Sequence, residues 1–182
     1  MGKLHELYKK TYTLDEKRDK DFFDCVSDYY FTDEFQSMRP YIQHGNINRI
    51  QHINSVAYMS YRIAKRLELD YYRTARGALL HDLFYYDWHD PDPSHRLHGY
   101  FHPGFALKNA RELSAKNQVE LTELEENIIR RHMFPLTVVP PKFRESVLVC
   151  LVDKYVATKE IIICSSEKRS RKFFSEVERE VK

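Results

Sequence analysis

The stretch ARGALLHDL, residues 75–83, places a histidine and an aspartate where the apolar face of a helix comes to its end. Asp82 lies four residues after Ala78 and three after Leu79, so it continues the inner face of a helix that begins at Tyr71. A carboxylate that points into a protein costs on the order of several kcal/mol unless a cation or strong donors meet it. His81 lies about 100° further round the helix axis and offers a second ligand beside it.

The segments on both sides of this stretch also carry helical patterns, and none carries a convincing strand. Between Asn48 and Leu69, apolar residues recur at steps of three and four, which predicts a helix with one buried face. Further helices are predicted over residues 16–38, 71–84, 102–116, 122–132 and 142–164, followed by a polar helix or tail. With 5 glycines and 7 prolines in the chain, we expect an all-α bundle of about seven to nine helices and no substantial sheet.

Length, charge and cysteine content limit the classes of protein to which the chain can belong. Its 182 residues suit a single domain, with an N-terminal helical extension (1–42), a metal-binding core (43–160) and a polar C-terminal helix or tail (161–182). A net charge of +2 gives no strong nucleic-acid signal. The cysteines form no C-x-x-C pair and no apolar run is long enough for a membrane span, which indicates a cytoplasmic protein. A homo-oligomer is compatible with this composition.

Four more polar side chains stand at inward positions of the predicted helices. His52 lies at the edge of an apolar stripe, His132 lies four residues after Ile128, and Asp153 is enclosed by the sequence VLVCLVDKYVA. His102 stands at the start of its helix, where a side chain can point into a cleft. Taken singly, each has an ordinary explanation, such as a hydrogen-bonded core histidine or an aspartate paired with an arginine. Taken together, one shared cation site satisfies all of them.

The donor set indicates the kind of metal. Imidazole nitrogen and carboxylate oxygen without cysteine suit Fe, Mn, Ni, Co or Zn better than a hard Ca²⁺ site, and Mg²⁺ is also compatible. Six potential ligands exceed what one such ion needs from the protein when it also holds water and substrate. One or two divalent ions are therefore expected, and Asp82 would bridge them in the two-ion case.

The chain resembles the HD superfamily of metal-dependent phosphohydrolases, all-helical domains that are named for the His-Asp doublet. The resemblance covers roughly residues 43–159: HINSVAYMSYRIAKRLELD is similar to the first metal-binding helix of the family, ARGALLHDL to the second and LVDKY to the last. It implies a first ion held by His52, His81, Asp82 and Asp153. It also implies that His102 and His132 match the additional pair of members with two ions.

The resemblance implies hydrolysis of a phosphomonoester or phosphodiester, of nucleotide-like chemistry, by metal-activated water. The substrate stays open between a nucleotide, a dinucleotide, a cyclic dinucleotide and a small ester, because the motifs of several subfamilies, including the GYP signature, are absent. A different class of function is a non-catalytic HD module that binds metal or nucleotide as a sensor or an assembly partner.

Several residues receive catalytic roles in this hypothesis. Asp82 would bridge or orient, and His102 or His132 would donate a proton if one ion is bound. Arg49 precedes His52 by almost one helical turn. Arg49, Arg131 and Lys154 are candidates to bind a phosphate group, and the alternative for each of them is an ordinary surface cation.

The segment from residue 85 to 101 is where we expect substrate choice to be decided. The aromatic residues of this segment are Tyr85, Tyr86 and Trp88, and their rings either stack on a substrate or pack on the domain. Its histidines are further candidates to reach the metals: His89, His95 and His98. The second doublet, His89-Asp90, belongs to no helical face and is interpreted as a coincidence.

Overall fold

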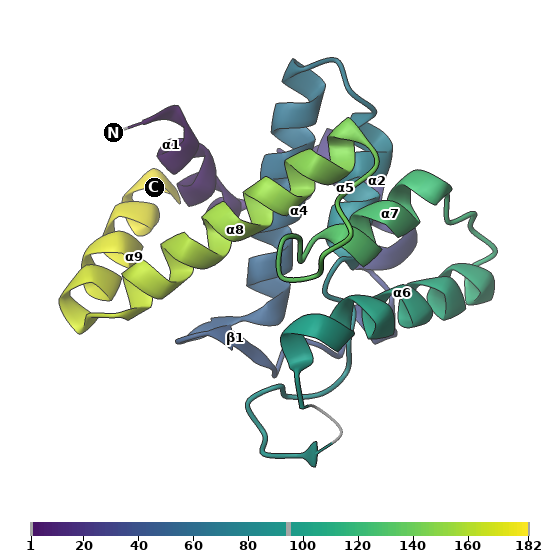
Figure 1. Ribbon diagram of the computed structural model, residues 1–182. Coiled ribbons are helices and arrows are strands. Elements are labelled where there is room, and N and C mark those ends of the chain that lie inside the picture. Colours follow the sequence, from purple (N-terminus) through teal and green to yellow (C-terminus); the bar gives the residue numbers. More distant parts are fainter. Residues whose placement is uncertain (1, 94–95, 182) are drawn as a thin grey trace.

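The computed structural model describes residues 2–93 and 96–181, and helices dominate both ranges (Figure 1). The helices are α1 (Lys3–Lys10), α2 (Lys20–Tyr30), α3 (Asp33–Gln36), α4 (Arg49–Arg66), α5 (Tyr71–Leu80), α6 (His98–Lys116), α7 (Glu123–Arg131), α8 (Arg144–Cys164) and α9 (Glu167–Val181). A 3-10 turn follows α1 at Thr11–Thr13, and two short strands, β1 (Ile42–His44) and β2 (Ile47–Asn48), precede α4. Within the described ranges the protein is all-α with nine helices, which confirms the predicted fold class.

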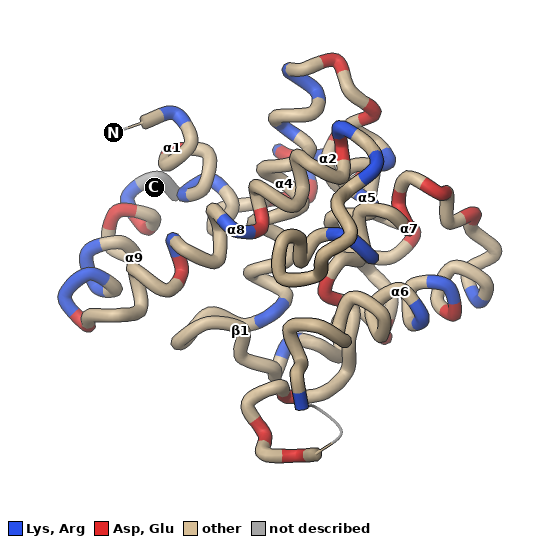
Figure 2. The backbone as a smooth tube through the Cα atoms, in the orientation of Figure 1, with Lys and Arg blue, Asp and Glu red and all other residues tan. Residues whose placement is uncertain are grey.

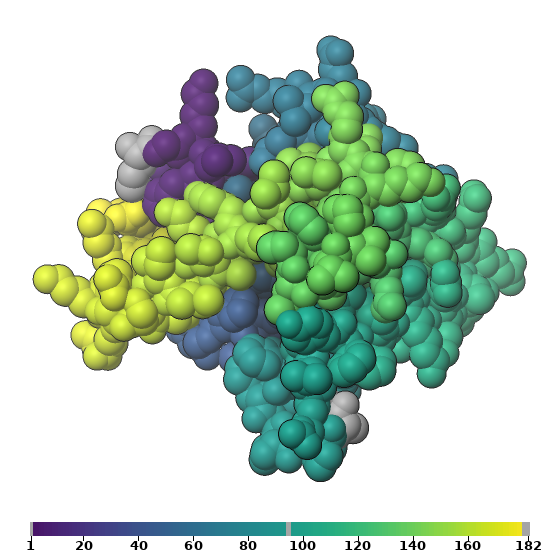
Figure 3. Space-filling model, in the orientation of Figure 1, coloured from purple at the N-terminus to yellow at the C-terminus, as the bar shows by residue number. Residues whose placement is uncertain are grey.

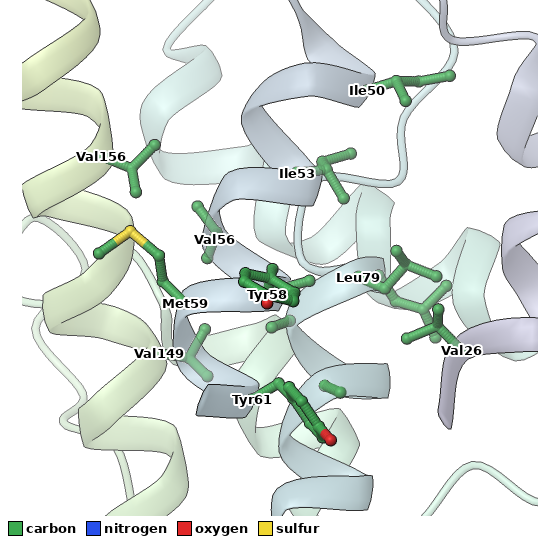
Figure 4. Packing of buried hydrophobic residues seen from close by; sticks show 14 of the residues in the cluster. Val26, Ile50, Ile53, Val56, Tyr58, Met59, Tyr61, Leu79, Val149 and Val156 are labelled. Atoms are coloured by element: carbon green, nitrogen blue, oxygen red, sulfur yellow. The ribbon is translucent and has the colours of Figure 1, made fainter. Parts of the chain in front are cut away.

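The core of the bundle forms around α4. Asn48 begins this helix because its side-chain oxygen accepts a hydrogen bond from the backbone N–H of Gln51 at 2.9 Å. Both α5 and α8 pack along α4, and α2 packs against α5. Figure 4 shows Val56 and Met59 of α4 directed towards α8, while Leu79 of α5 lies beside Val26 of α2. Burial of each such aliphatic side chain stabilises the fold by about 1.5–3 kcal/mol.

Two of the helix boundaries that differ from the sequence prediction lie beside candidate ligands. The pattern predicts a helix over 71–84, but α5 ends at Leu80, where the chain turns and the N–H of Leu83 donates to the Leu80 carbonyl. α6 begins at His98, four residues before the predicted start at His102. Because Pro103 lies close to the N-terminus of α6, its missing N–H removes a single helical hydrogen bond there and does not stop the helix from starting earlier.

Residues 42–48 form a small antiparallel hairpin in which Ile42 lies opposite Asn48. The turn uses Gly45 with φ of +61°, a conformation that glycine adopts without steric cost. The hairpin contacts both α4 and α8. It thereby places Gln43 and His44 against the helices that carry two of the candidate ligands.

The first helix, α1, and the last, α9, lie side by side (Figures 1 and 3). Phe173 of α9 packs against the rings of Tyr8 and Tyr12, with centroid distances of 5.6 and 5.1 Å. Along α9, a basic group of residues (Lys168, Arg169, Arg171 and Lys172) is followed by the acidic residues Glu176 and Glu178 (Figure 2). Among the described residues, none of the helices has the length and apolar character needed to cross a bilayer.

A close contact between α5 and α7 supplies a test of the packing. A Cβ atom added at Gly77 would lie 2.8 Å from Cδ1 and 3.1 Å from Cβ of Ile128, an approach that side-chain rotation cannot relieve. We expect Gly77→Ala to lower the free energy of unfolding by about 1–3 kcal/mol, although alanine is the better helix former. Urea denaturation measures this change. The double variant Gly77→Ala/Ile128→Ala should lose less free energy of unfolding than the sum of the losses in the two single variants. Simple additivity of the two losses would show that the contact is not tight.

Candidate metal centre

The six side chains selected from the sequence meet at one place in the fold. They come from five elements or their ends: His52 from α4, His81 and Asp82 from the turn after α5, His102 from α6, His132 from the residue after α7, and Asp153 from α8. All six are buried, and even the most exposed, Asp153, shows 7% of its surface. The fold thus gathers four imidazoles and two carboxylates in a region that water scarcely reaches.

One half of this cluster, the first half-site, is formed by His52, His81, Asp153 and one oxygen of Asp82. The Oδ1 atom of Asp153 lies 3.3 Å from Nε2 of His52 and 3.7 Å from Nε2 of His81. The Oδ2 atom of Asp82 lies 3.9 and 3.6 Å from the same two nitrogens. The ligand atoms of His52, His81 and Asp153 are close enough together to hold a metal ion.

The other half, the second half-site, is formed by His102, His132 and the remaining oxygen of Asp82. The Oδ1 atom of Asp82 lies 3.2 Å from Nε2 of His102 and 3.5 Å from Nε2 of His132. The two imidazole nitrogens lie 2.8 Å from each other. Asp82 therefore stands between the half-sites and turns one carboxylate oxygen to each.

Three of the four histidines are oriented by backbone carbonyl groups. Their Nδ1 atoms lie 2.7–2.9 Å from the carbonyl oxygens of residues three or four earlier in the chain: Ala78 for His81, His98 for His102, and Ile129 for His132. A carbonyl oxygen can only accept, so each Nδ1 carries the proton. The Nε2 atoms are left to face the centre of the cluster, which is the arrangement of a metal-binding histidine.

His52 is oriented by a carboxylate instead. Its Nδ1 lies 2.8 Å from Oε2 of Glu160, which is fully buried on α8. Burial by itself acts to lower the pKa of His52, but Glu160 and Asp153 outweigh it and raise this pKa well above its usual value. Metal-free His52 therefore also holds a proton on Nε2, and an ion bound at this nitrogen has to displace it.

Charges within the cluster fix the protonation of the remaining ligands. Burial opposes ionisation of Asp82, yet His81, His102 and His132 outweigh it and hold the pKa of Asp82 well below its usual range. Burial opposes ionisation of Asp153 in the same way, and its histidine neighbours still lower the pKa of this carboxyl. Burial, together with His102 and His81, lowers the pKa of His132 to about 3. At neutral pH the carboxylates are charged, and His132 presents a neutral nitrogen.

A cation fits the needs of this cluster. The Nε2 atom of His81 and the Oδ1 atom of Asp82 are buried and have no hydrogen-bond partner among the described residues. The nitrogens of His102 and His132, 2.8 Å apart, would repel each other unless a proton or a cation lies between them. A divalent ion in either half-site supplies the charge that these atoms lack.

The structure does not support Arg49 as a phosphate contact. This side chain is fully buried, and its guanidinium donates to the carbonyls of Phe84 and Tyr86 at 2.7 and 3.0 Å. It also donates to Oε1 of Gln43, whose amide donates in turn to Oδ2 of Asp82 at 2.9 Å. Arg49 therefore lies beneath the cluster and orients Asp82 through Gln43.

A cavity of about 700 Å³ opens on the cluster, between the hairpin, the start of α6, the α7–α8 loop and α8 (Figure 3). Lys154 lines it and donates through Nζ to the carbonyl of His132 at 2.7 Å, so it remains a candidate phosphate contact. Arg131 is not among the lining residues. A larger cavity of about 930 Å³ lies beside α1, but none of the candidate ligands lines it. The smaller cavity is therefore the candidate substrate site.

The segment from residue 85 to 101 contributes part of the cavity wall. Trp88 and His98 line it, and the Tyr86 hydroxyl lies 3.0 Å from Nδ1 of His98. His89 pairs at the surface with the carboxylate of Asp87, and Tyr85 is exposed. His95 lies outside the described residues. Of these rings, Trp88 is the one placed to meet a substrate.

Sequence reasoning missed three residues of this site. Glu160 follows Asp153 by seven residues, two helical turns, so it could have been found as a second acidic residue on the same face of α8. Gln43 and His44 both line the cavity from β1. No periodic pattern points to them, because a three-residue strand is too short to show one.

Comparison with known proteins gives one result. A family model described as HD domain matches residues 49–158, more than half of the chain, and confirms the resemblance inferred from the sequence pattern. Neither the curated proteins nor the solved structures contain a match to the chain.

The raised pKa of His52 predicts that metal binding depends on pH. As the pH falls below that pKa, protons compete with the metal for Nε2, so the affinity should increase as pH rises from 6 to 8. One displaced proton corresponds to roughly tenfold in affinity per pH unit. Calorimetric titration with Zn²⁺ in buffers of different ionisation enthalpy measures both quantities. An affinity that does not change with pH, without proton release, would contradict the protonation assigned to His52.

Glu160 should contribute to metal retention without touching the ion. Glu160→Gln keeps an oxygen that can accept from Nδ1 of His52 but removes the charge, and we expect roughly a 10–100-fold loss of metal affinity. Competition with a chelator measures it. Glu112→Gln, at an exposed position of α6, is the matched control and should leave the affinity unchanged. Equal metal affinities of the two variants would show that the charge of the buried Glu160 carboxylate does not contribute to metal binding.

Proposed function

The chain belongs to the HD domain family, and from this we propose that it is a metal-dependent phosphohydrolase. Its substrate would be a phosphomonoester or phosphodiester, nucleotide-like in chemistry, cleaved by metal-activated water. The observation that carries the proposal is the position of Asp82, which turns one oxygen to each of two histidine pairs. A lone structural ion would not require that second pair.

One or two divalent ions would be held by this chain. His52, His81, Asp82 and Asp153 would hold the first ion, and Asp82, His102 and His132 the second. A bound divalent ion lowers the pKa of water from 15.7 to about 7, which makes hydroxide available at neutral pH, and it acts as a Lewis acid towards a phosphoryl oxygen. Fe, Mn, Ni, Co and Zn suit the nitrogen and oxygen donors, and Mg²⁺ is compatible with them.

The protein's own residues perform the remaining tasks. Lys154 lies at the cavity wall beside Asp153, where its ammonium group can contact a phosphate oxygen. If one ion is bound, the proton shared between His102 and His132 lies next to the cavity and can be donated to the leaving oxygen. Gln43 keeps the Asp82 carboxylate oriented throughout.

The competing function is a non-catalytic module that binds metal or nucleotide as a sensor or an assembly partner. A full metal content without turnover of any phosphate ester would favour it. We place the protein in the cytoplasm because all three cysteines are free thiols, as expected in a reducing compartment. Self-association into a homo-oligomer is part of the same proposal.

Removal of the bridging charge tests the proposed activity. We expect Asp82→Asn and Asp153→Asn to lose metal and to lower the turnover of p-nitrophenyl phosphate or bis-p-nitrophenyl phosphate at least 100-fold, roughly 2.7 kcal/mol of transition-state stabilisation. Activity is measured with Mn²⁺ and metal content by elemental analysis. Asp21→Asn, at an exposed position of α2, serves as the control. Retained turnover in Asp82→Asn would remove this carboxylate from the mechanism.

A further inference from the structure

The cavity has two chemically different sides. The metal cluster forms one side, and the other is formed by the side chains of Trp88, Met133, Pro135 and Leu136. We propose that the substrate is a monoester with a single phosphate on a flat, largely apolar ring system. This inference rests on the proposed function and narrows it: the phosphate lies at the metal cluster and the ring lies against the apolar side.

Away from the metal cluster, the cavity offers little positive charge to a second phosphate. Lys154 is the only lysine or arginine among the lining residues in the part of the chain that the structure describes. Arg49, the nearest cation below, is fully buried and directs its donors to carbonyl and amide oxygens. A second phosphate would therefore lie against the apolar side chains, where a charge loses its hydration without compensation.

The Trp88 ring at the cavity wall is in contact with two histidine rings, that of His98 and that of His89, whose centroid lies 3.9 Å away. The indole ring is nearly parallel to that of His98, with an interplanar angle of 13° and a centroid distance of 5.4 Å. His98 stacks in turn on His102, at 15° and 4.4 Å. The three rings form a column that ends on a candidate metal ligand, which fixes the position of the indole relative to the cluster. These ring contacts hold the indole at the cavity wall, where its apolar surface can meet an apolar part of a ligand.

The rest of the apolar side is formed by the loop that follows α7. Leu136 remains 40% exposed although it lines the cavity, so a ligand ring that covers it would remove apolar surface from water. Gly99 at the start of α6 allows this wall to approach closely, since a Cβ atom there would lie 2.9 Å from Cδ2 of Leu136. The cavity of about 700 Å³ has room for a ring system together with one phosphate.

The experiment uses phosphonates, which bind like phosphate esters but are not cleaved. Trp88 is the only tryptophan of the chain, so its fluorescence reports directly on a ligand at this wall. We titrate the Zn²⁺-loaded protein with phenylphosphonate, methylphosphonate and pyrophosphate. The expected result is that phenylphosphonate binds roughly tenfold or more tightly than methylphosphonate and changes the fluorescence. Equal affinities, or tighter binding of pyrophosphate, would overturn the inference.

A variant pair separates the ring contact from the phosphate contact. Leu136→Ser should lower the affinity for phenylphosphonate several-fold and leave the affinity for methylphosphonate and the metal content unchanged. Leu151→Ser, at an exposed position of α8 outside the cavity, should change neither affinity. If Leu136→Ser weakens both phosphonates equally, the wall does not recognise the ring and the inference fails.

Two ring chemistries share these features, and a further arm distinguishes them. Tighter binding of a nucleoside 5′-phosphonate than of phenylphosphonate assigns the ring to a nucleobase, and the reverse order assigns it to a plain aryl group. Failure of this inference is distinct from failure of the proposed function. Turnover of p-nitrophenyl phosphate without ring preference removes the ring-binding proposal alone, whereas absence of both turnover and phosphonate binding removes the two together.

Discussion

The rest of the structure depends on the buried carboxylate of Asp82. A charge with 3% of its surface exposed has lost nearly all its hydration, so it needs positive charge or donors from every side. Four imidazoles, from α4, α6 and the ends of α5 and α7, supply this environment together with the amide of Gln43. Two helices and two helix ends thus have to meet at fixed positions, and the geometry of the bundle follows from that requirement.

Helix ends provide much of the orientation in the cluster. His81 and His132 each occupy the first position after a helix, where the last turn leaves carbonyl groups without helical partners. Each imidazole bonds a carbonyl of that turn and so directs its other nitrogen to the centre. His52 lies inside α4, where the carbonyls are already engaged by the helix. It is oriented instead by Glu160 from a neighbouring helix, whose charge also changes the protonation of the ring.

Arg49 connects the cluster to the segment that forms the cavity wall. Its guanidinium bonds the carbonyls of residues 84 and 86 on one side and Gln43 of the hairpin on the other. It also lies over the Phe84 ring, 3.7 Å from the ring centre. The start of the 85–101 segment and the orientation of Asp82 therefore depend on the same buried cation. A change in either would be transmitted to the other through this side chain.

The sequence by itself determined the all-α class, most helix positions and the six candidate ligands. It could do so because helical periodicity shows which side chains point inward, and an ionisable group at such a position is improbable without a partner. Only the tertiary structure decided that Arg49 lies beneath the cluster, that Gln43 and Glu160 orient the ligands, and that Trp88 faces the cavity. These roles depend on contacts between residues far apart in the chain, such as Gln43 with Asp82 and His52 with Glu160. Periodicity describes one element at a time, and it contains no information about which elements meet.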